Sequence, residues 1–457
     1  MCMLRLIVIK TSSVRSAIYQ TELILITNVS DVSIGLFFTW NICIMAGGAA
    51  MAWSNPILLM LGEDPVNEEN PLGRPISEEE AAWIGSLAAV GTLIICLFPG
   101  YLAEKWGRRA TLLSSVVPYL LGWIILATGK SIEALYVARF VSGLGIAVAF
   151  AILPMYCGEI AETSIRGILG SLFQIFITLG QLWAYCIGPY VSYTHYWIAC
   201  AVLPIAFFVL FLPMPESPHY LAAKGRTEEV IKVLARLRGK SEDAVRYEAN
   251  EIEAAVRENL NRKATIMDLF KVKANLKALF ITCALVTFQQ MSGLVQLFGS
   301  CVNPLVVDRL GRRILLIISG TGSALSLGAI GLFFYLKDAA KSDVSGIGWL
   351  PLTSMIIYMS TYSVGLGPLP WTIMGEMFSP EIKTKASGIT VFICCFLAFV
   401  VSKYFISVAV SFGQFTAFWF FGVFCILSVL FTVFILPETK GKSLQEIQNE
   451  LAGKASK

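Results

Sequence analysis

Side chains that could form ion pairs occur in three short motifs, and each motif appears twice in the same order along the chain. Arginine and lysine pair with carboxylates through charge-assisted hydrogen bonds, which must break when the helices that carry them separate. Ordered repetition of this kind is typical of a chain built from two related halves. The pairs are Glu104–Arg109 and Asp308–Arg313, Glu159 with Arg166 and Glu376 with Lys383, and Pro215–Ser217 and Pro437–Thr439.

We predict that these acid–arginine motifs pair across the two halves at the cytoplasmic ends of helices and hold that side closed. Gly107 and Gly311 would permit the tight turn within each Gly-Arg-Arg sequence. The alternative is that the arginines only anchor the chain on the cytoplasmic side, which explains their sign but not the repeated acids. The predicted network contains Glu104, Arg108, Arg109, Glu159, Arg166, Asp308, Arg312, Arg313, Glu376 and Lys383.

The elements that position these motifs must lie in a membrane, because the chain is too apolar for a soluble protein. Of its 457 residues, 56% are hydrophobic and 14% are charged, whereas about a quarter are charged in soluble domains. A soluble protein could not keep so much apolar surface from water. This excludes secreted disulfide scaffolds, disordered proteins and soluble enzymes, and it predicts an all-α polytopic membrane protein.

A helix crosses a bilayer with about 20 apolar residues, and eleven segments approach or exceed that length. Lysine and arginine gather in the loop 104–109, in the segment 213–275 and in the tail after Leu436. The positive-inside rule therefore predicts that these parts and both termini are cytoplasmic. The candidate spans are Gly35–Leu61, Trp83–Tyr101, Ala110–Ala127, Leu135–Tyr156, Ile168–Ile187, Tyr196–Leu212, Leu276–Val307, Ile314–Leu336, Leu350–Met374, Ser387–Val410 and Phe415–Leu436.

The domain organisation follows from these spans. We expect a cytoplasmic N-terminal segment 1–34, a transmembrane half 35–212, a cytoplasmic helical loop 213–275, a second transmembrane half 276–436 and a cytoplasmic tail 437–457.

Amphipathic helices are expected in the central loop and in the tail. Ser217 followed by Pro218 is a favourable helix start, and Ser443–Glu446 has the pattern of a capping box. The predicted apolar faces are Val230, Leu234 and Leu237 in the loop, and Leu444, Ile447 and Leu451 in the tail, with Lys232, Arg236 and Arg238 facing water.

Taken together, the motifs resemble the sugar porter branch of the major facilitator superfamily, and within it the insect facilitated trehalose and glucose transporters. The resemblance implies two parallel-related six-helix halves, nominally twelve spans, and it adds Arg139 to the cytoplasmic network. The motifs that carry it are Gly100–Arg109, Arg139–Gly143, Pro154–Glu159 with Arg166, Pro215–Leu221, Phe288–Gly293, Asp308–Arg313, Gly367–Trp371 with Glu376, and Pro437–Gly441.

The resemblance also implies a sugar site at the centre of the bundle. Glutamine amides both donate and accept hydrogen bonds toward hydroxyls, and an indole can stack on the apolar face of a pyranose. Without the resemblance, a glutamine in a span would more often join helices. The implied site residues are Gln174, Gln289, Gln290 and Trp371, and Gly367, Pro368 and Pro370 would break the tenth helix to form a gate.

The sequence departs from the family pattern between Leu276 and Val307. These 32 residues should hold two spans and a turn, which need about 44 residues. A single crossing would move Asp308–Arg313 and the tail outside, against the charge rule. We favour a turn at Ser292-Gly293 between two arms of about 15 residues, so that spans 7 and 8 are shortened at 293–308. The polar residues that the family places at Val295 and at Cys394-Cys395 are also replaced.

We therefore predict a sugar uniporter of the plasma membrane that moves trehalose or a hexose such as glucose by alternating access. No Asp or Glu lies within Gly35–Leu61, which favours facilitated diffusion over proton coupling. Lys403, the odd cation of the eleventh span, is expected to snorkel to an interface. The first alternative is a sugar sensor or an inactive shortened variant of the same family.

The second alternative, a membrane enzyme, is disfavoured because the sequence shows neither a nucleophile–base set nor a Cys/His metal cluster. We therefore expect no cofactor and no metal, and a sugar and the lipid bilayer as partners rather than nucleic acid. The sequence does not predict an oligomeric state.

Overall fold

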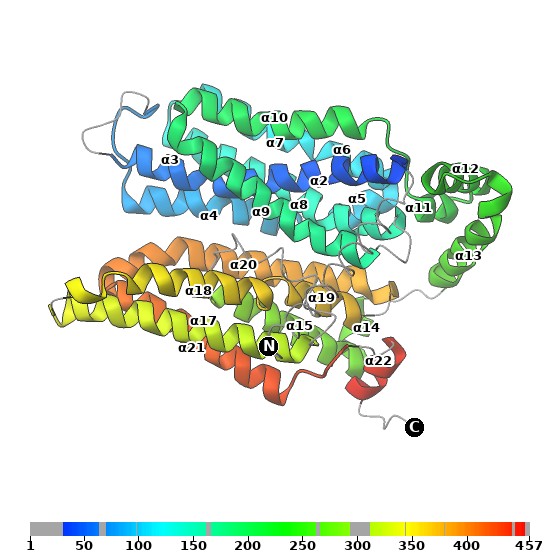
Figure 1. Ribbon diagram of the computed structural model, residues 1–457. Helices are drawn as coiled ribbons and strands as arrows, with labels where there is room; N and C mark the ends of the chain where they lie inside the picture. The colour runs from blue at the N-terminus through cyan, green and yellow to red at the C-terminus, as the bar shows by residue number, and fades with distance from the viewer. Residues whose placement is uncertain are drawn as a thin grey trace, which may run out of the picture.

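The computed structural model describes residues 31–63, 70–96, 98–160, 166–261, 266–292, 311–342, 344–378, 380–440 and 444–452. Within these residues the secondary structure is helical. Two layers of long helices lie side by side, one from each half of the chain, and short helices cover one end of both layers (Figure 1).

The first layer is formed by residues 31–211. Ser77 begins α4 as a true capping box with Glu80, and Ser192 caps α10 by accepting a hydrogen bond from the His195 backbone. The helices are α2 (Asp31–Ala52), α3 (Ser54–Leu61), α4 (Glu78–Ile95), α5 (Pro99–Trp106), α6 (Arg108–Ser114), α7 (Val116–Thr128), α8 (Ile132–Ile160), α9 (Arg166–Ile187), the 3-10 turn η1 (Gly188–Tyr190) and α10 (Tyr193–Phe211).

The second layer is formed by residues 273–434. Its longest helix, α20, continues without a break for 33 residues. The elements are α15 (Lys273–Met291), α17 (Arg312–Phe334), the π-turn η2 (Tyr335–Ala339), the 3-10 turn η3 (Ser345–Ile347), α18 (Leu350–Val364), α19 (Leu369–Met377), α20 (Pro380–Phe412) and α21 (Gln414–Phe434).

Each layer has its own apolar core. The buried clusters of the first layer contain Trp53, Tyr119 and Tyr156, and that of the second contains Tyr358 and Tyr362. Because none of the described clusters mixes buried residues from the two layers, each layer is a separately packed unit. This arrangement suits two halves that move as bodies.

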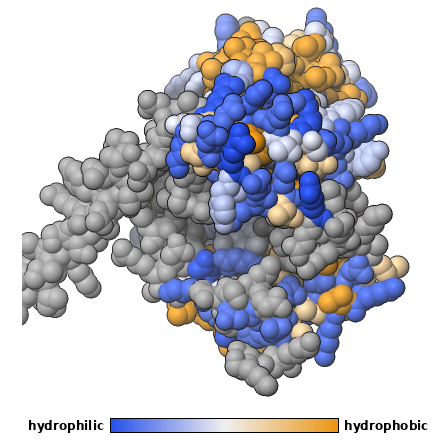
Figure 2. All heavy atoms as spheres, turned by 90° about the vertical axis from the view of Figure 1, so that its right-hand side faces the viewer, coloured by the Kyte–Doolittle hydropathy of each residue, from blue (hydrophilic) through white to orange (hydrophobic). Residues whose placement is uncertain are grey.

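Short amphipathic helices cover one end, which we call the motif end; the opposite end, where α3 ends and α4 begins, is the far end (Figure 1). Gly107 directly precedes α6 and Gly311 directly precedes α17, and both helices start at the motif end. Figure 2 looks onto the motif end and shows hydrophilic residues gathered over its centre. The short helices are α11 (Pro218–Ala223), α12 (Thr227–Arg238), α13 (Glu242–Asn261), α14 (Ile266–Lys271) and α22 (Leu444–Ala452).

The apolar stripe predicted for the central loop is confirmed, because Val230, Leu234 and Leu237 are fully buried. Ser217 caps α11 with its hydroxyl, as predicted. The expectation that Arg238 faces water is wrong: its side chain is 9% exposed and pairs with Glu248.

Arg238 also donates to the Ile160 carbonyl at the end of α8, so it anchors the loop to the bundle. In the tail, Ile447 and Leu451 are buried as predicted. The capping residue Ser443 lies outside the described residues.

By length and composition, seven helical segments of the described residues could cross a membrane, or eight if the bent pair α4 and α5 is one span. The helices coincide with the predicted spans except around Leu276–Val307. There, α15 has 19 residues, longer than the predicted arm of about 15, because it starts at Lys273. It ends at Met291, at the predicted turn, and residues 293–310 lie outside the described part.

Candidate substrate site and ion-pair network

At the motif end of the first half, a carboxylate and an arginine form a two-point ion pair. Arg108 on α6 contacts Glu159 on α8, with Nη2–Oε1 at 2.8 Å and Nε–Oε2 at 2.9 Å. The Ser217 hydroxyl also donates to Glu159. Bidentate pairs of this geometry are among the strongest side-chain contacts, so they tie the ends of α6, α8 and α11 together.

A second carboxylate of the first half caps a helix start. Glu216 accepts hydrogen bonds from the backbone N–H groups of Arg108 and Arg109, at 2.9 and 3.1 Å. These groups have no partner within the helix, and they carry the positive end of its dipole. Gly107 precedes them at φ 95° and ψ 164°, a conformation that is essentially restricted to glycine.

The second half repeats the carboxylate cap and the arginine–glutamate ion pair, but the Thr439 hydroxyl, which stands at the position of Ser217, has no hydrogen-bond partner among the described residues. Glu438 accepts from the backbone N–H groups of Arg312 and Arg313, at 3.0 and 3.1 Å, and Gly311 has φ 88°. Arg312 Nη2 contacts Glu376 Oε1 at 2.8 Å. The duplication seen in the motifs is therefore a duplication of hydrogen bonds.

The second arginine of each motif also has the same role in both halves. Arg109 donates to the Leu212 carbonyl, just after α10, and Arg313 donates to the Val433 carbonyl near the end of α21. Both bonds join the motif to the last long helix of its own half.

Burial and hydrogen bonding act in opposite directions on the pKa of Glu438. Partial burial raises it, but the backbone N–H groups of Lys440, Arg312, Arg313 and Thr439 together outweigh that effect, so the pKa is lowered. Glu438 is therefore held as a carboxylate at the start of α17.

The expectation that these ion pairs join the two halves is wrong for the described residues. Arg108 pairs with Glu159 and Arg312 pairs with Glu376, each within its own half. The reason is that α8 packs directly against α6, so the acid of the same half is nearest. Glu104 is exposed on α5 and stays outside this network of described contacts.

Three predicted members of the network remain predictions. Arg166 starts α9 and Lys383 lies on α20, but their side chains are outside the description, and so is the whole of Asp308.

Arg139 does not belong to the network, which corrects the implication of the resemblance. It lies near the start of α8, toward the far end, and is buried. Its Nε donates to the Ile84 carbonyl at 3.0 Å and its Nη1 to the Ala50 carbonyl at 2.6 Å. Its guanidinium also lies 5.8 Å from the Trp53 ring centroid. Arg139 thus joins α8 to α2 and α4.

Two of the predicted sugar-binding residues lie together at the end of α15. Gln289 donates to the Gly367 carbonyl, and Gln290 Nε2 lies 2.7 Å from Cys394 Sγ on α20. The side-chain Oε1 atoms of both glutamines are buried and accept no hydrogen bond from the described residues. A buried acceptor without a donor is unfavourable, so both oxygens are suited to a ligand hydroxyl.

The helix break lies beside this pair. α18 ends at Val364 and α19 begins at Leu369, so residues 365–368 leave the helix. The Ser319 hydroxyl accepts a hydrogen bond from the Leu366 N–H in this break. Whether Gly367, Pro368 and Pro370 act as a gate remains a prediction.

For the other two predicted sugar-binding residues, the structure gives the helix on which each lies but no contact with the glutamines. Trp371 is half-buried on α19, which packs against α15. Gln174 lies on α9, but its side chain is not among those described.

Several contacts of this site were not predicted. Tyr362 donates to the Gln289 carbonyl and Tyr358 to the Ser292 carbonyl, and both tyrosines are buried in α18. In the sequence they stand four residues apart in an apolar helix. The same spacing is common among residues that only pack helices together, so it does not indicate a role in the site. Glu216 and Glu438 likewise stood in repeated motifs without an assigned role.

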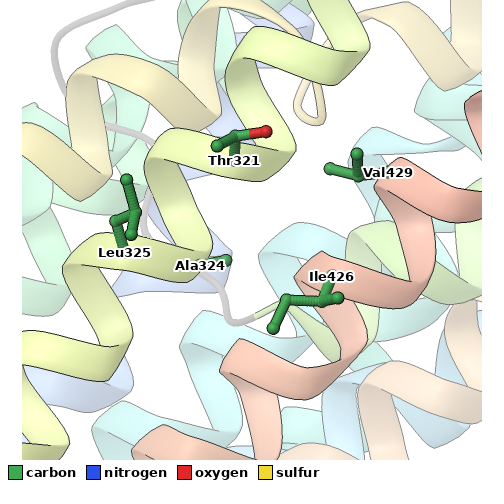
Figure 3. Close-up of a pocket in the computed structure, with 5 residues that line it drawn as sticks. All are labelled: Thr321, Ala324, Leu325, Ile426 and Val429. Atoms are coloured by element: carbon green, nitrogen blue, oxygen red, sulfur yellow. The ribbon is translucent and has the colours of Figure 1, made fainter.

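A separate surface pocket of about 270 Å³ lies between α17 and α21 (Figure 3), and neither glutamine is among its lining residues. Its lining is Thr321, Ala324, Leu325, Ile426 and Val429. Because this lining is almost entirely apolar, it cannot satisfy the hydroxyls of a sugar, and we place the candidate substrate site at Gln289 and Gln290.

Two separately packed helical halves, duplicated motifs at one end and buried polar groups beside a helix break define a membrane transporter of the major facilitator type. Known proteins support this class. The family model described as "Sugar (and other) transporter" matches residues 28–300 and 293–451. The chain belongs to this family of sugar transporters, which are not enzymes.

Curated relatives include the facilitated trehalose transporter Tret1 of Polypedilum vanderplanki, which is 33% identical over 90% of this chain and 86% of its own length. The Tret1-2 homolog of Drosophila simulans is 33% identical over 91% of this chain and 90% of its own length. Among solved structures, the E. coli xylose transporter XylE in a partially occluded inward-open conformation has a TM-score of 0.74 at 21% identity, covering 91% of this chain and all of XylE.

Proposed function

We propose that the chain moves a sugar, trehalose or a hexose such as glucose, down its gradient across the plasma membrane. The observation that carries this proposal is the pair of buried amide oxygens of Gln289 and Gln290, which accept nothing from the described protein. The curated relatives named above are facilitated trehalose transporters, which supports a sugar as the ligand.

In the proposed mechanism, a sugar binds between the two halves, beside Gln174, Gln289, Gln290 and Trp371. Its hydroxyls donate to the two free amide oxygens, and Trp371 stacks on its apolar face. The two halves then rock about this site, while the break at residues 365–368 lets α18 and α19 change their angle. No carboxylate lies within residues 35–61, in keeping with uniport rather than proton coupling.

The motif end is proposed to face the cytoplasm, together with both chain termini. Its support is the concentration of lysine and arginine in residues 104–109, 213–275 and the tail, as the positive-inside rule requires. We also propose that the shortened segment 276–307 still permits transport, because α15 carries the glutamines intact and the second half packs around it.

The test is the uptake of radiolabelled trehalose and glucose by liposomes containing the purified chain. We expect saturable uptake, and a Gln290→Ala variant should lose about 5- to 10-fold in Vmax/KM because one hydrogen bond of about 1 kcal/mol disappears. Gln414→Ala, at an exposed glutamine of the far end, is the matched control and should transport normally. Uptake by the parent chain no better than by Gln290→Ala would sink the proposal.

A further inference from the structure

One helix pair joins the two halves most extensively in the described part of the chain: α4 of the first half and α20 of the second. α4 begins at the far end with Glu78, and α20 reaches that end at Phe412. A contact between the outer turns of these helices therefore bears directly on whether the halves separate at the far end.

A lysine lies within this contact. Lys403 on α20 has its Nζ 4.1 Å from the ring centroid of Trp83 on α4, and 3.8 Å from Glu79 Oε1 one turn away. The Phe399 ring, one turn before Lys403, lies 6.2 Å from the Trp83 ring. Residues four apart on each helix thus face each other across the interface.

The surroundings of Lys403 contradict the expectation that it snorkels to a membrane interface. Its side chain is only 12% exposed, whereas its acidic partner Glu79 is 81% exposed. An ammonium group held this close over an indole is stabilised by the negative face of the ring, most strongly when little water reaches it. Trp83 is therefore the principal partner of the cation and Glu79 the weaker one.

This contact differs from the ion pairs of the motif end. Arg108–Glu159 and Arg312–Glu376 each lie within one half, so rigid-body separation of the halves leaves them intact. The contacts of Lys403 with Trp83 and Glu79 cross from one half to the other, so they must break when the far end opens.

We propose that Glu79, Trp83, Phe399 and Lys403 form a far-end clasp that holds the two halves together and favours the conformation closed at that end. This inference goes beyond the proposed sugar transport, because it requires only that the two halves move relative to each other. Cation–aromatic contacts of this kind change an equilibrium by about 2- to 30-fold. Loss of the clasp should raise the ratio of far-end-open to far-end-closed molecules on the order of tenfold.

The test measures the distance between the halves at the far end of the full chain in nanodiscs without sugar. Probes are placed at Thr128 and Gln414, both exposed helix termini of the far end, through a non-canonical amino acid that leaves the native cysteines intact. Pulsed dipolar spectroscopy then gives the populations of short and long distances. Lys403→Met removes the charge but keeps the chain length, Trp83→Leu removes the ring, and Lys403→Arg keeps a cation that can stack on Trp83.

We expect the short distance to dominate in the parent chain and in Lys403→Arg. Lys403→Met and Trp83→Leu should each shift the population toward the long distance by about tenfold. If Lys403→Met fails to fold, Trp83→Leu carries the same prediction from the other half. Unchanged distances in a folded Lys403→Met or Trp83→Leu variant, or an equal shift in Lys403→Arg, would overturn the clasp. Because no sugar is added, this result is independent of whether the chain transports sugar.

Discussion

At the scale of single residues, the capping glutamates and the glutamines of the candidate substrate site differ in how many of their hydrogen bonds the protein itself supplies. Glu216 and Glu438 each accept backbone hydrogen bonds at a helix start, so they stabilise the fold. Gln289 and Gln290 use their amide N–H groups within the protein and leave their Oε1 atoms without a donor among the described residues. This contrast separates structural side chains from those that we assign to the substrate.

The lowered pKa of Glu438 leads to a pH-dependent prediction. A carboxylate with a lowered folded pKa adds stability above its ordinary pKa of 4.5, and this stability is lost as the pH falls through the lowered value. Glu438→Gln should therefore reduce the Tm at pH 6, because the charged cap of α17 is worth up to about 1 kcal/mol.

Thermal unfolding of parent and Glu438→Gln in detergent at several pH values checks this prediction. The difference in Tm should be constant from pH 7 to pH 5 and should shrink below pH 4.5. A difference that grows as the pH falls would show that Glu438 acts through something other than its charge.

At the scale of elements, the turn before each Gly-Arg-Arg helix depends on a single glycine. A Cβ at Gly107 would lie 2.2 Å from Glu216 Oε2, and one at Gly311 would lie 2.9 Å from Glu438 Oε2. The glycine thus permits both the turn and the close approach of the carboxylate that caps the next helix. In each half, the same glycine is therefore required both by its backbone conformation and by its contact with the capping carboxylate.

Gly107→Ala should destabilise the chain by about 1–3 kcal/mol, since alanine cannot adopt this backbone conformation without strain, and the cap at Glu216 is displaced as well. Gly225→Ala is the matched control: Gly225 also has a positive φ, of 72°, but its Cβ would meet nothing within 4 Å. The Tm of Gly107→Ala should fall clearly more than that of Gly225→Ala. Equal losses would mean that the close contact with Glu216 is unimportant.

The helices could largely be predicted from the sequence, because apolar length and capping residues such as Ser217 act locally. The partners of the ion pairs could not, because motif spacing does not say whether Arg108 meets an acid of its own half or of the other. Lys403 shows the same limit: an isolated cation in an apolar helix suggests snorkelling, and only the position of Trp83 on another helix shows otherwise. Long-range partners depend on how helices are placed, which local patterns do not encode.

At the scale of the whole molecule, the repeated hydrogen bonds make each half a body with its own core and its own closed set of contacts at the motif end. The described contacts between the bodies are concentrated on α4 and α20. During a conformational change, such an arrangement breaks and forms contacts mainly between the halves, including those around the substrate, while the contacts within each half are kept. It is the structural basis of the alternating access that we propose.

The most direct measurement is counterflow of radiolabelled trehalose and glucose in liposomes that contain only this chain, at equal pH on both sides. Vesicles preloaded with unlabelled sugar should transiently accumulate the label well above its equilibrium level, and imposing a pH gradient in a parallel experiment should leave the rate unchanged. Label entry no faster than in protein-free vesicles, for both sugars and with a folded chain, would contradict the account.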